Sequence, residues 1–364
     1  MNIEAIAGML KVAGKKTEHN GYDKYSLLSL RGVFSPSYNY LFDVDTGEFA
    51  RWGVTLEDDP EWCPFGCEIA DVEISEGDCT GKCPWCYKSN PEHNGKHMTL
   101  ATFRKVFDLF PATLTQIALG LTDLDANPDL LDIMRYCLDN DVVPNFTTAG
   151  FGATPALVKA TAEMAGAVAV SVYPHTKEKA YETIRMFQAE GMDQVNIHLL
   201  YHADNMSFVY SVLDDVRNKD VEPNAVVLLG LKPKGRGSNM KPLSPERFTT
   251  LINWCLKNEL PMGFDSCSCK KFLKAVDDLG IKGEQREYFH TVAEPCESGL
   301  FSIYVSRDAK VYPCSFTEDK HKAINLALFK PGEFTEEIWN HPAMEDWRDV
   351  LLSNNRACPV YEID

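Results

Sequence analysis

Residues 77–90 have the sequence GDCTGKCPWCYKSN, in which Cys79, Cys83 and Cys86 fall within eight residues. Cysteines separated by three and then by two residues allow one short loop to turn three sulfur atoms toward a common centre. Three thiolates suit a [4Fe-4S] cluster with one iron left open, or an incomplete zinc site. Cys63 and Cys67 are near enough in the sequence to complete a zinc site, so this spacing leaves both metals open.

A regular alternation of strand and helix patterns surrounds the cysteine stretch. Six short apolar runs are each followed by a helical pattern, and parallel strands that are buried on both faces have this character. Six β-then-α units predict a parallel sheet with helices outside, either doubly wound and open or a partial barrel. The predicted strands are 70–75, 116–121, 144–150, 167–173, 194–202 and 224–231. Because the cysteines follow the first strand, we expect them at the carboxyl-terminal face, where ligands bind.

The composition excludes several classes of partner. The 364 residues carry a formal net charge of −17, so we expect neither nucleic acid nor an anionic membrane as a partner. No apolar stretch approaches the roughly 18–20 residues that span a bilayer. The first residues, MNIEAIAGMLKVAGKK, predict a short amphipathic helix and not a signal peptide. We therefore expect a cytoplasmic protein whose 12 cysteines serve metal or redox chemistry.

Two regions flank the repeating units. Residues 1–68 predict an N-terminal extension with a β-hairpin that turns at Asp45, Thr46 and Gly47. The strand–helix alternation stops after about residue 262, and residues 263–364 carry five further cysteines. Two of these, Cys296 and Cys314, bracket a second predicted hairpin. The expected domains are therefore 1–68, 69–262 and 263–364.

The motif Cys79-x3-Cys83-x2-Cys86, with Trp85 before its last cysteine, resembles the signature of the radical S-adenosylmethionine superfamily. The resemblance covers about residues 70–260 and implies that superfamily's partial (β/α)6 barrel, which is TIM-like. It implies that the three cysteines hold a [4Fe-4S] cluster whose fourth iron binds S-adenosylmethionine. It also implies a reductant such as flavodoxin or ferredoxin, and a 5′-deoxyadenosyl radical that takes a hydrogen atom from the substrate.

The same resemblance implies residues that bind the cofactor. Where the superfamily has a Gly-Gly-Glu-Pro turn, this chain has residues 121–124, Leu-Thr-Asp-Leu, which keep one carboxylate. Polar residues on the inward faces of strands four and five resemble positions that hold ribose or substrate, and the alternative is satisfied core residues. The stretch LLGLKPKGRG after strand six resembles one that runs past adenine, and its basic residues are otherwise solvated surface. The expected cofactor-binding residues are Trp85, Asp123, Ser171, Asn196, His198 and Arg236.

The C-terminal cysteines resemble the first half of the SPASM and twitch extensions, which hold an auxiliary iron–sulfur cluster. Ala309 stands where the usual pattern has glycine, and the full SPASM cysteine run is missing, so a twitch-like domain with one auxiliary [4Fe-4S] cluster is favoured. A zinc-held hairpin is the alternative. The expected ligands are Cys267, Cys296, Cys314 and Cys358, with Cys269 as the alternative to Cys267.

The expected function is that of a radical S-adenosylmethionine enzyme that modifies a peptide or protein side chain. Dehydrogenation or rearrangement of a small polar metabolite is the second candidate. A non-catalytic iron–sulfur or zinc protein that binds or transfers electrons is the third, and the altered turn at residues 121–124 favours it.

Overall fold

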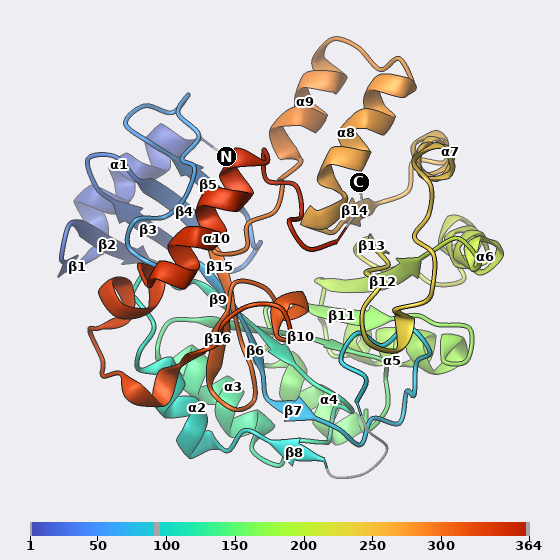
Figure 1. Cartoon of the computed structure of the whole chain (residues 1–364), viewed down its shortest axis with the longest axis horizontal. Helices are drawn as coiled ribbons and strands as arrows, with labels where there is room; N and C mark the ends of the chain where they lie inside the picture. Colours follow the sequence, from blue (N-terminus) through green and yellow to red (C-terminus); the bar gives the residue numbers. More distant parts are fainter. Residues whose placement is uncertain (1, 91–94, 362–364) are drawn as a thin grey trace.

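The computed structural model describes residues 2–90 and 95–361, and it contains one large sheet with smaller sheets beside it (Figure 1). The large sheet has ten strands in the order β14-β13-β12-β11-β10-β9-β6-β15-β16-β17. A five-stranded sheet forms most of the N-terminal unit. A two-stranded ladder, β7 (Ser75–Glu76) with β8 (Lys96–His97), flanks the cysteine loop.

The N-terminal unit is an antiparallel meander with one helix on it. Its helix is α1 (Ile3–Ala13), and its strands are β1 (Lys15–His19), β2 (Tyr22–Leu27), β3 (Leu30–Phe34), β4 (Asn39–Asp43) and β5 (Phe49–Trp52). The amphipathic helix expected at the N-terminus is confirmed, and Leu10 is its fully buried residue. The hairpin expected at Asp45–Gly47 is confirmed as β4 paired with β5. The sequence analysis did not predict β1, β2 and β3.

Six parallel strands and their helices form the middle of the chain. The strands are β6 (Ile69–Glu73), β9 (Gln116–Gly120), β10 (Val143–Thr148), β11 (Val168–Ser171), β12 (Val195–Tyr201) and β13 (Val226–Gly230). The helices are α2 (Leu100–Phe107), α3 (Leu130–Asp139), α4 (Pro155–Ala162), α5 (Lys177–Ala189), α6 (Met206–Arg217) and α7 (Pro245–Lys257). All six expected strands and their following helices are present, and each strand pairs in parallel with its sequence neighbour.

The strands differ from the expectation in their burial, because only their outer faces are fully buried. On β12, Ile197 and Leu199 are fully buried in the core that includes the helices, whereas His198 and Leu200 between them are only half-buried. We call the other side of the sheet the inner face; its residues include Asp71, Ala118, Gly120, Thr147, Ala169, His198, Leu200 and Leu229. The expectation of strands buried on both faces was therefore wrong, since a curved sheet keeps its concave side partly open.

The C-terminal region adds strands at both edges of the six-stranded sheet. At one edge β14 (Met262–Phe264) pairs in parallel with β13, and at the other edge β15 (Ser302–Val305) pairs in parallel with β6. The expected second hairpin is confirmed as β15 paired with β16 (Lys310–Tyr312), and β17 (Ile324–Asn325) follows it. The sheet therefore crosses the expected boundary at residue 262, and the three-domain division stays a prediction.

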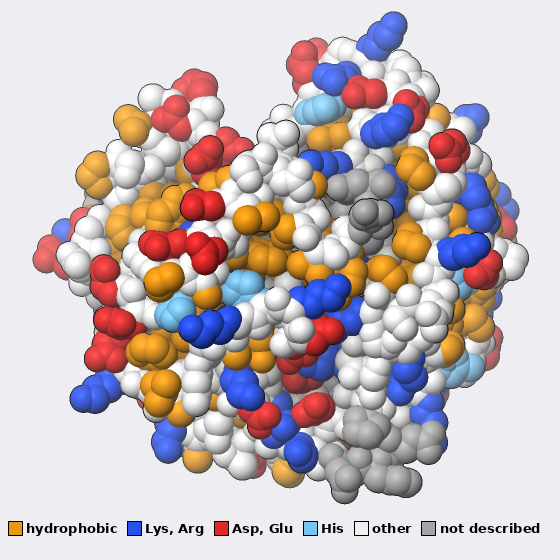
Figure 2. All heavy atoms as spheres, in the orientation of Figure 1, with side chains coloured by type: hydrophobic (Ala, Val, Ile, Leu, Met, Phe, Trp, Pro, Cys, Tyr) orange, Lys and Arg blue, Asp and Glu red, His pale blue; other side chains and the backbone are white. Residues whose placement is uncertain are grey.

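Helices of the C-terminal region complete the molecule. They are α8 (Cys269–Asp278), α9 (Glu284–Val292), a π-helical turn (Phe334–Trp339) and α10 (Pro342–Ser353). Figure 1 shows α8 and α9 projecting together at the top of the molecule, while α10 crosses beside the N-terminal sheet. The outline of the molecule dips between the α8–α9 pair and the N-terminal sheet with α10 beside it (Figure 2). No helix in the described part of the chain is long and apolar enough to cross a membrane.

One partly buried arginine joins the three parts of the chain. Arg51 on β5 donates to the carboxylates of Glu68, just before β6, and Glu297, in the C-terminal region, each at 2.8 Å. Glu68 is fully buried and also accepts from the hydroxyl of Tyr38. Burial raises the pKa of Glu68, and the charge of Arg51 opposes that rise.

We predict that Arg51→Met lowers the free energy of unfolding by about 3–5 kcal/mol, because it leaves a buried carboxylate without its cation. The folded-state pKa of Glu68 should then rise further above its unfolded value. Stability should therefore be lost as the pH rises through that pKa, and acidification from pH 7 toward pH 5 should restore part of it. Urea unfolding at both pH values measures this, with Arg286→Met as the control.

Arg286 forms an exposed pair with Asp277, so its loss should cost little stability, because solvent screens such pairs. A loss from Arg51→Met as small as that of the control would contradict the structural role of Arg51.

Candidate functional site

The three motif cysteines lie on a loop that follows β6 and β7. Asp78 and Lys82 have positive φ angles of 44° and 43°, so the loop turns sharply around Cys79. The sulfur atoms of Cys79 and Cys83 each lie 3.5 Å from the position that a Cβ atom on Gly81 would occupy. Two of the three sulfurs are therefore on the same side of this turn, as a shared metal site requires.

Three loops that follow other strands of the sheet hold this turn. The carboxylate of Asp123, after β9, accepts from the backbone N–H of Thr80 at 3.1 Å and from its hydroxyl at 2.5 Å. The Nε2 atom of His175, after β11, lies 2.8 Å from the carbonyl oxygen of Gly81. The third contact comes from Arg236, after β13. Together they fix the backbone of the loop before any ligand binds.

The Arg236 contact is the most extensive of the three. Its guanidinium donates to the carbonyl oxygens of Cys83 at 2.8 Å and Asn90 at 3.0 Å, and its backbone N–H donates to Cys86 at 3.0 Å. Gly235 allows this approach, since a Cβ atom there would lie 2.5 Å from the carbonyl oxygens of Cys86 and Tyr87. Its φ of +59° is also one that side chains rarely adopt. The backbone of residues 235–236 therefore packs directly on the cysteine loop.

The thiols of this loop are costly to ionise without a cation. Burial and the charge of the neighbouring thiols raise the pKa of Cys83 to about 12, although Arg236 opposes the rise. Burial also raises the pKa of Cys79, and Asp123 and Cys86 add to the effect. Because metal ligands must be deprotonated, a positive centre among the sulfurs would remove this penalty. The donor set therefore fits an iron–sulfur cluster.

Polar atoms around the loop fit a further bound molecule. Trp85 Nε1, Thr122 Oγ1 and His202 Nε2 are buried and have no hydrogen-bond partner within the described ranges. The ring of Trp85 packs edge-on against Tyr173 at 5.1 Å and lies 6.1 Å from that of His202. Buried polar groups normally have partners, so these three indicate a ligand with hydrogen-bonding groups. S-adenosylmethionine has such groups.

The C-terminal cysteines form a second group. The charges of Cys296 and Cys358 raise the pKa of Cys314 beyond the effect of burial, to about 12. Burial raises the pKa of Cys267 well above its usual range, and the charges of Cys296 and Cys314 contribute. The four thiols are therefore electrostatic neighbours, although they come from separate segments of the chain. In the described residues, no three His, Cys, Asp or Glu side chains are gathered closely enough for a single metal ion.

The structure separates Cys267 from its alternative, Cys269. Cys269 is buried at the start of α8 and its thiol lies 3.4 Å from the carbonyl oxygen of Ala293.

Cys63 and Cys67 are buried before β6, whereas the motif loop follows its opposite end, about 16 Å away at 3.3 Å per residue. Cys63 and Cys67 are therefore not placed to complete a zinc site with the motif cysteines.

A buried lysine connects the loop after β13 with the second cysteine group. Lys232 forms an ion pair with Asp265, which lies just after β14, and its ammonium is 5.4 Å from the Phe316 ring. Burial alone would lower the pKa of Lys232, but Asp265 and Cys267 raise it. The basic stretch 231–241 is therefore not a purely solvated surface, because part of it is buried beside the cysteines.

The remaining predicted residues are spread along the inner face. Ser171 is buried at the end of β11. His198 lies on β12, and burial lowers its pKa to about 4 although the charge of Asp265 acts in the opposite direction. Asn196 accepts from the side chain of Asn224 at 3.0 Å near the start of β12, and the structure does not bring it to the cysteine loop. Their cofactor roles stay predictions.

His175 was not among the residues predicted from the sequence, and Arg236 and Asp123 have other partners in the structure than those we expected. We expected Asp123 and Arg236 to face bound groups, whereas both hold the loop backbone in the structure. The position of His175, shortly after the fourth strand, was the available signal, because loops at that end of a parallel sheet meet.

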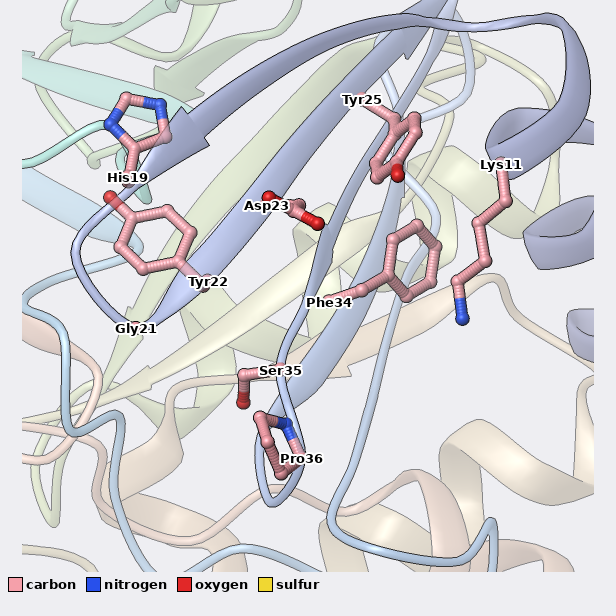
Figure 3. A pocket seen from close by; sticks show the side chains of 9 residues that line it. All are labelled: Lys11, His19, Gly21, Tyr22, Asp23, Tyr25, Phe34, Ser35 and Pro36. Atoms are coloured by element: carbon pink, nitrogen blue, oxygen red, sulfur yellow. The ribbon is translucent and has the colours of Figure 1, made fainter.

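A separate groove of about 540 Å³ lies on the N-terminal unit (Figure 3). Lys11 of α1 and Tyr25 and Phe34 of the sheet line it, and Figure 3 shows Asp23 near them. His19 lies at the other side of the groove, where its ring stacks on that of Tyr22 at 4.8 Å. Every lining residue belongs to the first 36 residues of the chain, so this groove is not part of the cysteine sites.

Comparison with known proteins shows the fold. No family model and no curated protein matches the chain. Among solved structures, Streptococcus suis SuiB bound to precursor peptide SuiA has a TM-score of 0.59 at 12% identity, over 78% of this chain and 67% of that chain. SuiB bound to S-adenosylmethionine has a TM-score of 0.57 at 11% identity, over 78% and 68%. The anSMEcpe structure with S-adenosylmethionine and the Cp18Cys peptide has a TM-score of 0.56 at 14% identity, over 76% of this chain and 82% of that chain.

These similarities confirm the predicted fold, an α/β partial barrel.

We predict that Arg236→Met speeds the loss of the motif cluster. Loss of the guanidinium contacts at this exposed site should cost about 1.4 kcal/mol, at the low end for hydrogen bonds from a charged group. Iron release to a chelator from anaerobically reconstituted protein should become about tenfold faster. Arg185→Met is the matched control, since exposed Arg185 of α5 donates to the backbone carbonyl of Asp220 at 2.9 Å, on the segment that leads into β13 at the opposite end of the sheet. Equal rates in the two variants would exclude this role of Arg236.

Proposed function

We propose that this chain is a radical S-adenosylmethionine enzyme that modifies a side chain of a peptide or protein. The observation that carries the proposal is the cysteine loop itself. It lies at the carboxyl ends of the parallel strands and is held by residues from three other strand ends. When bound, a reduced [4Fe-4S] cluster supplies the electron that splits S-adenosylmethionine and so yields a radical able to take a hydrogen atom from substrate.

Different residues of the chain would bind the cluster and S-adenosylmethionine. Cys79, Cys83 and Cys86 would hold the cluster, and the unpartnered atoms of Trp85, Thr122 and His202 would bind S-adenosylmethionine. The buried strands and the outer helices would keep bulk water from the inner face, which protects a reactive species.

Peptide substrates are favoured over metabolites by two observations. SuiB and anSMEcpe share the fold and have been solved with peptides bound. The inner face is also lined by small or half-buried residues, among them Ala118, Gly120 and Ala169, which leave room at the sheet. We propose a reductant such as flavodoxin or ferredoxin as the partner that supplies electrons.

A non-catalytic electron-transfer protein is the second candidate. The observation in its favour is Asp123, whose carboxylate is already used by Thr80 in the turn where the superfamily binds the amino group of S-adenosylmethionine. Cleavage of S-adenosylmethionine separates the two candidates, since only the enzyme performs it.

We predict that anaerobically reduced protein forms 5′-deoxyadenosine from S-adenosylmethionine. The Cys79/Cys83/Cys86 triple Ala variant should form none, while it keeps the far-ultraviolet circular dichroism of the wild type. Chromatography of the nucleoside products measures this. Formation by the triple variant would refute the site, and no formation by wild-type protein that holds its iron would favour the electron-transfer candidate.

We predict an auxiliary cluster that is independent of the first. Reconstituted wild-type protein should hold about eight irons and the triple Ala variant about four, if each site takes a [4Fe-4S] cluster. Cys267→Ala should lower the iron content of the triple variant further, whereas Cys269→Ala should leave it unchanged. Zinc in place of the remaining iron would contradict the auxiliary cluster. If Cys269→Ala lowers the iron content and Cys267→Ala does not, Cys269 is the ligand in place of Cys267.

A further inference from the structure

Asp71 is a carboxylate inside the barrel. It is the third residue of β6, and the residues on either side of it, Ala70 and Val72, are fully buried in the core on the outer face. Its side chain therefore points to the inner face, where it is exposed. The residue beside it on β9 is Ala118, followed on the same face by Gly120, so space is left next to the carboxylate.

The side chain of Asp71 makes no hydrogen bond or ion pair with any residue in 2–90 or 95–361, although its backbone is paired in the sheet. The other acids near this end of the sheet differ from it. Glu73, two residues along β6, binds Lys88 at 3.0 Å and also accepts from Tyr304 at 3.0 Å. Asp265 is paired with Lys232.

The basic side chains of Lys88, Lys234 and Arg307 are likewise paired with other acids. Lys88 contacts Glu318 at 2.5 Å in addition to Glu73, and Lys234 contacts Asp319 at 2.9 Å. Arg307 is paired with Glu76 and Asp308 at 2.8 and 2.7 Å. The carboxylate of Asp71 is therefore the charge at the inner face that these pairs leave uncompensated.

Asp71 also lies between the two cysteine groups. Its charge acts on Tyr87, which follows Cys86, and on Cys314 of the second group. Both groups become anionic when their thiols ionise to bind metal. Asp71 is exposed to the space at the inner face, and the protein atoms that enclose this space raise its pKa to about 6 by partial desolvation. A cationic group in this space would offset that cost.

We propose that Asp71 binds a cationic group of the substrate, an ammonium or guanidinium, and so makes the enzyme select peptides with a basic residue near the site of modification. This proposal rests on the proposed function for its substrate class. The ammonium group of S-adenosylmethionine is the competing occupant, and the experiment separates the two.

The test compares two synthetic peptide pools that share their randomised positions and differ at one fixed residue. That residue is lysine in one pool and norleucine, its uncharged analogue, in the other. Equilibrium dialysis against reconstituted protein measures binding without any need for turnover. Wild-type protein should retain the lysine pool about tenfold better, as expected for one charged contact.

Asp71→Asn should bring the ratio of the two pools close to one, because it removes the charge and keeps the shape. Asp71→Glu should keep a preference for lysine. Asp139→Asn, an exposed change at the end of α3, is the matched control and should keep the wild-type ratio.

Three results would overturn the proposal: no lysine preference in the wild type, a preference that survives in Asp71→Asn, or weaker binding of S-adenosylmethionine by Asp71→Asn when no peptide is present. A lysine preference that depends on Asp71, in protein that does not cleave S-adenosylmethionine, would support this proposal while refuting the proposed function.

Discussion

The parallel pairing of β15 with β6 is the constraint on which the two cysteine sites depend. β6 lies between β9 and β15, so its backbone groups are bonded on both sides and its end is fixed. The motif loop leaves from that end. The chain after β15 turns into β16 and reaches Cys314 directly afterwards. β16 runs back along β15, so the ladder leads the chain to Cys314 away from the end of β15 that adjoins the motif loop. The ring of Phe316, two residues later, then lies 4.5 Å from that of Tyr87 and joins this segment to the motif loop.

Electrostatics explains why so many polar groups lie around the cysteines. Buried thiols resist ionisation, and each neighbouring thiolate adds to the cost, as the raised pKa values of Cys83 and Cys314 indicate. Two described cations near these thiols are already engaged with other groups. The arginine at the loop, Arg236, is used on backbone carbonyls, and Lys232 is paired with Asp265. The arrangement fits residues that fix geometry while a metal centre supplies the positive charge.

The sequence was sufficient for features that repeat locally, and insufficient for contacts between distant segments. Apolar runs such as 194–202 predicted β12 because period and length are local properties, and the spacing of Cys79, Cys83 and Cys86 is itself a short-range pattern. Strand β1, KKTEH, is polar and largely exposed, so it carries no hydrophobic signal. The pairing of Ser302 with Ile69 and the bond from Arg236 to Cys83 depend on tertiary structure, which no local pattern encodes.

The position of β6 also has a consequence for synthesis of the chain. β6 is the first strand of the large sheet to leave the ribosome, yet its partner Ser302 is translated more than 230 residues after Ile69. One edge of β6 must therefore remain unpaired while the rest of the barrel forms, and exposed strand edges invite association with other chains. Contacts of such long sequence separation also slow folding. We therefore expect chaperones to bind the nascent barrel until its C-terminal region emerges and covers that edge.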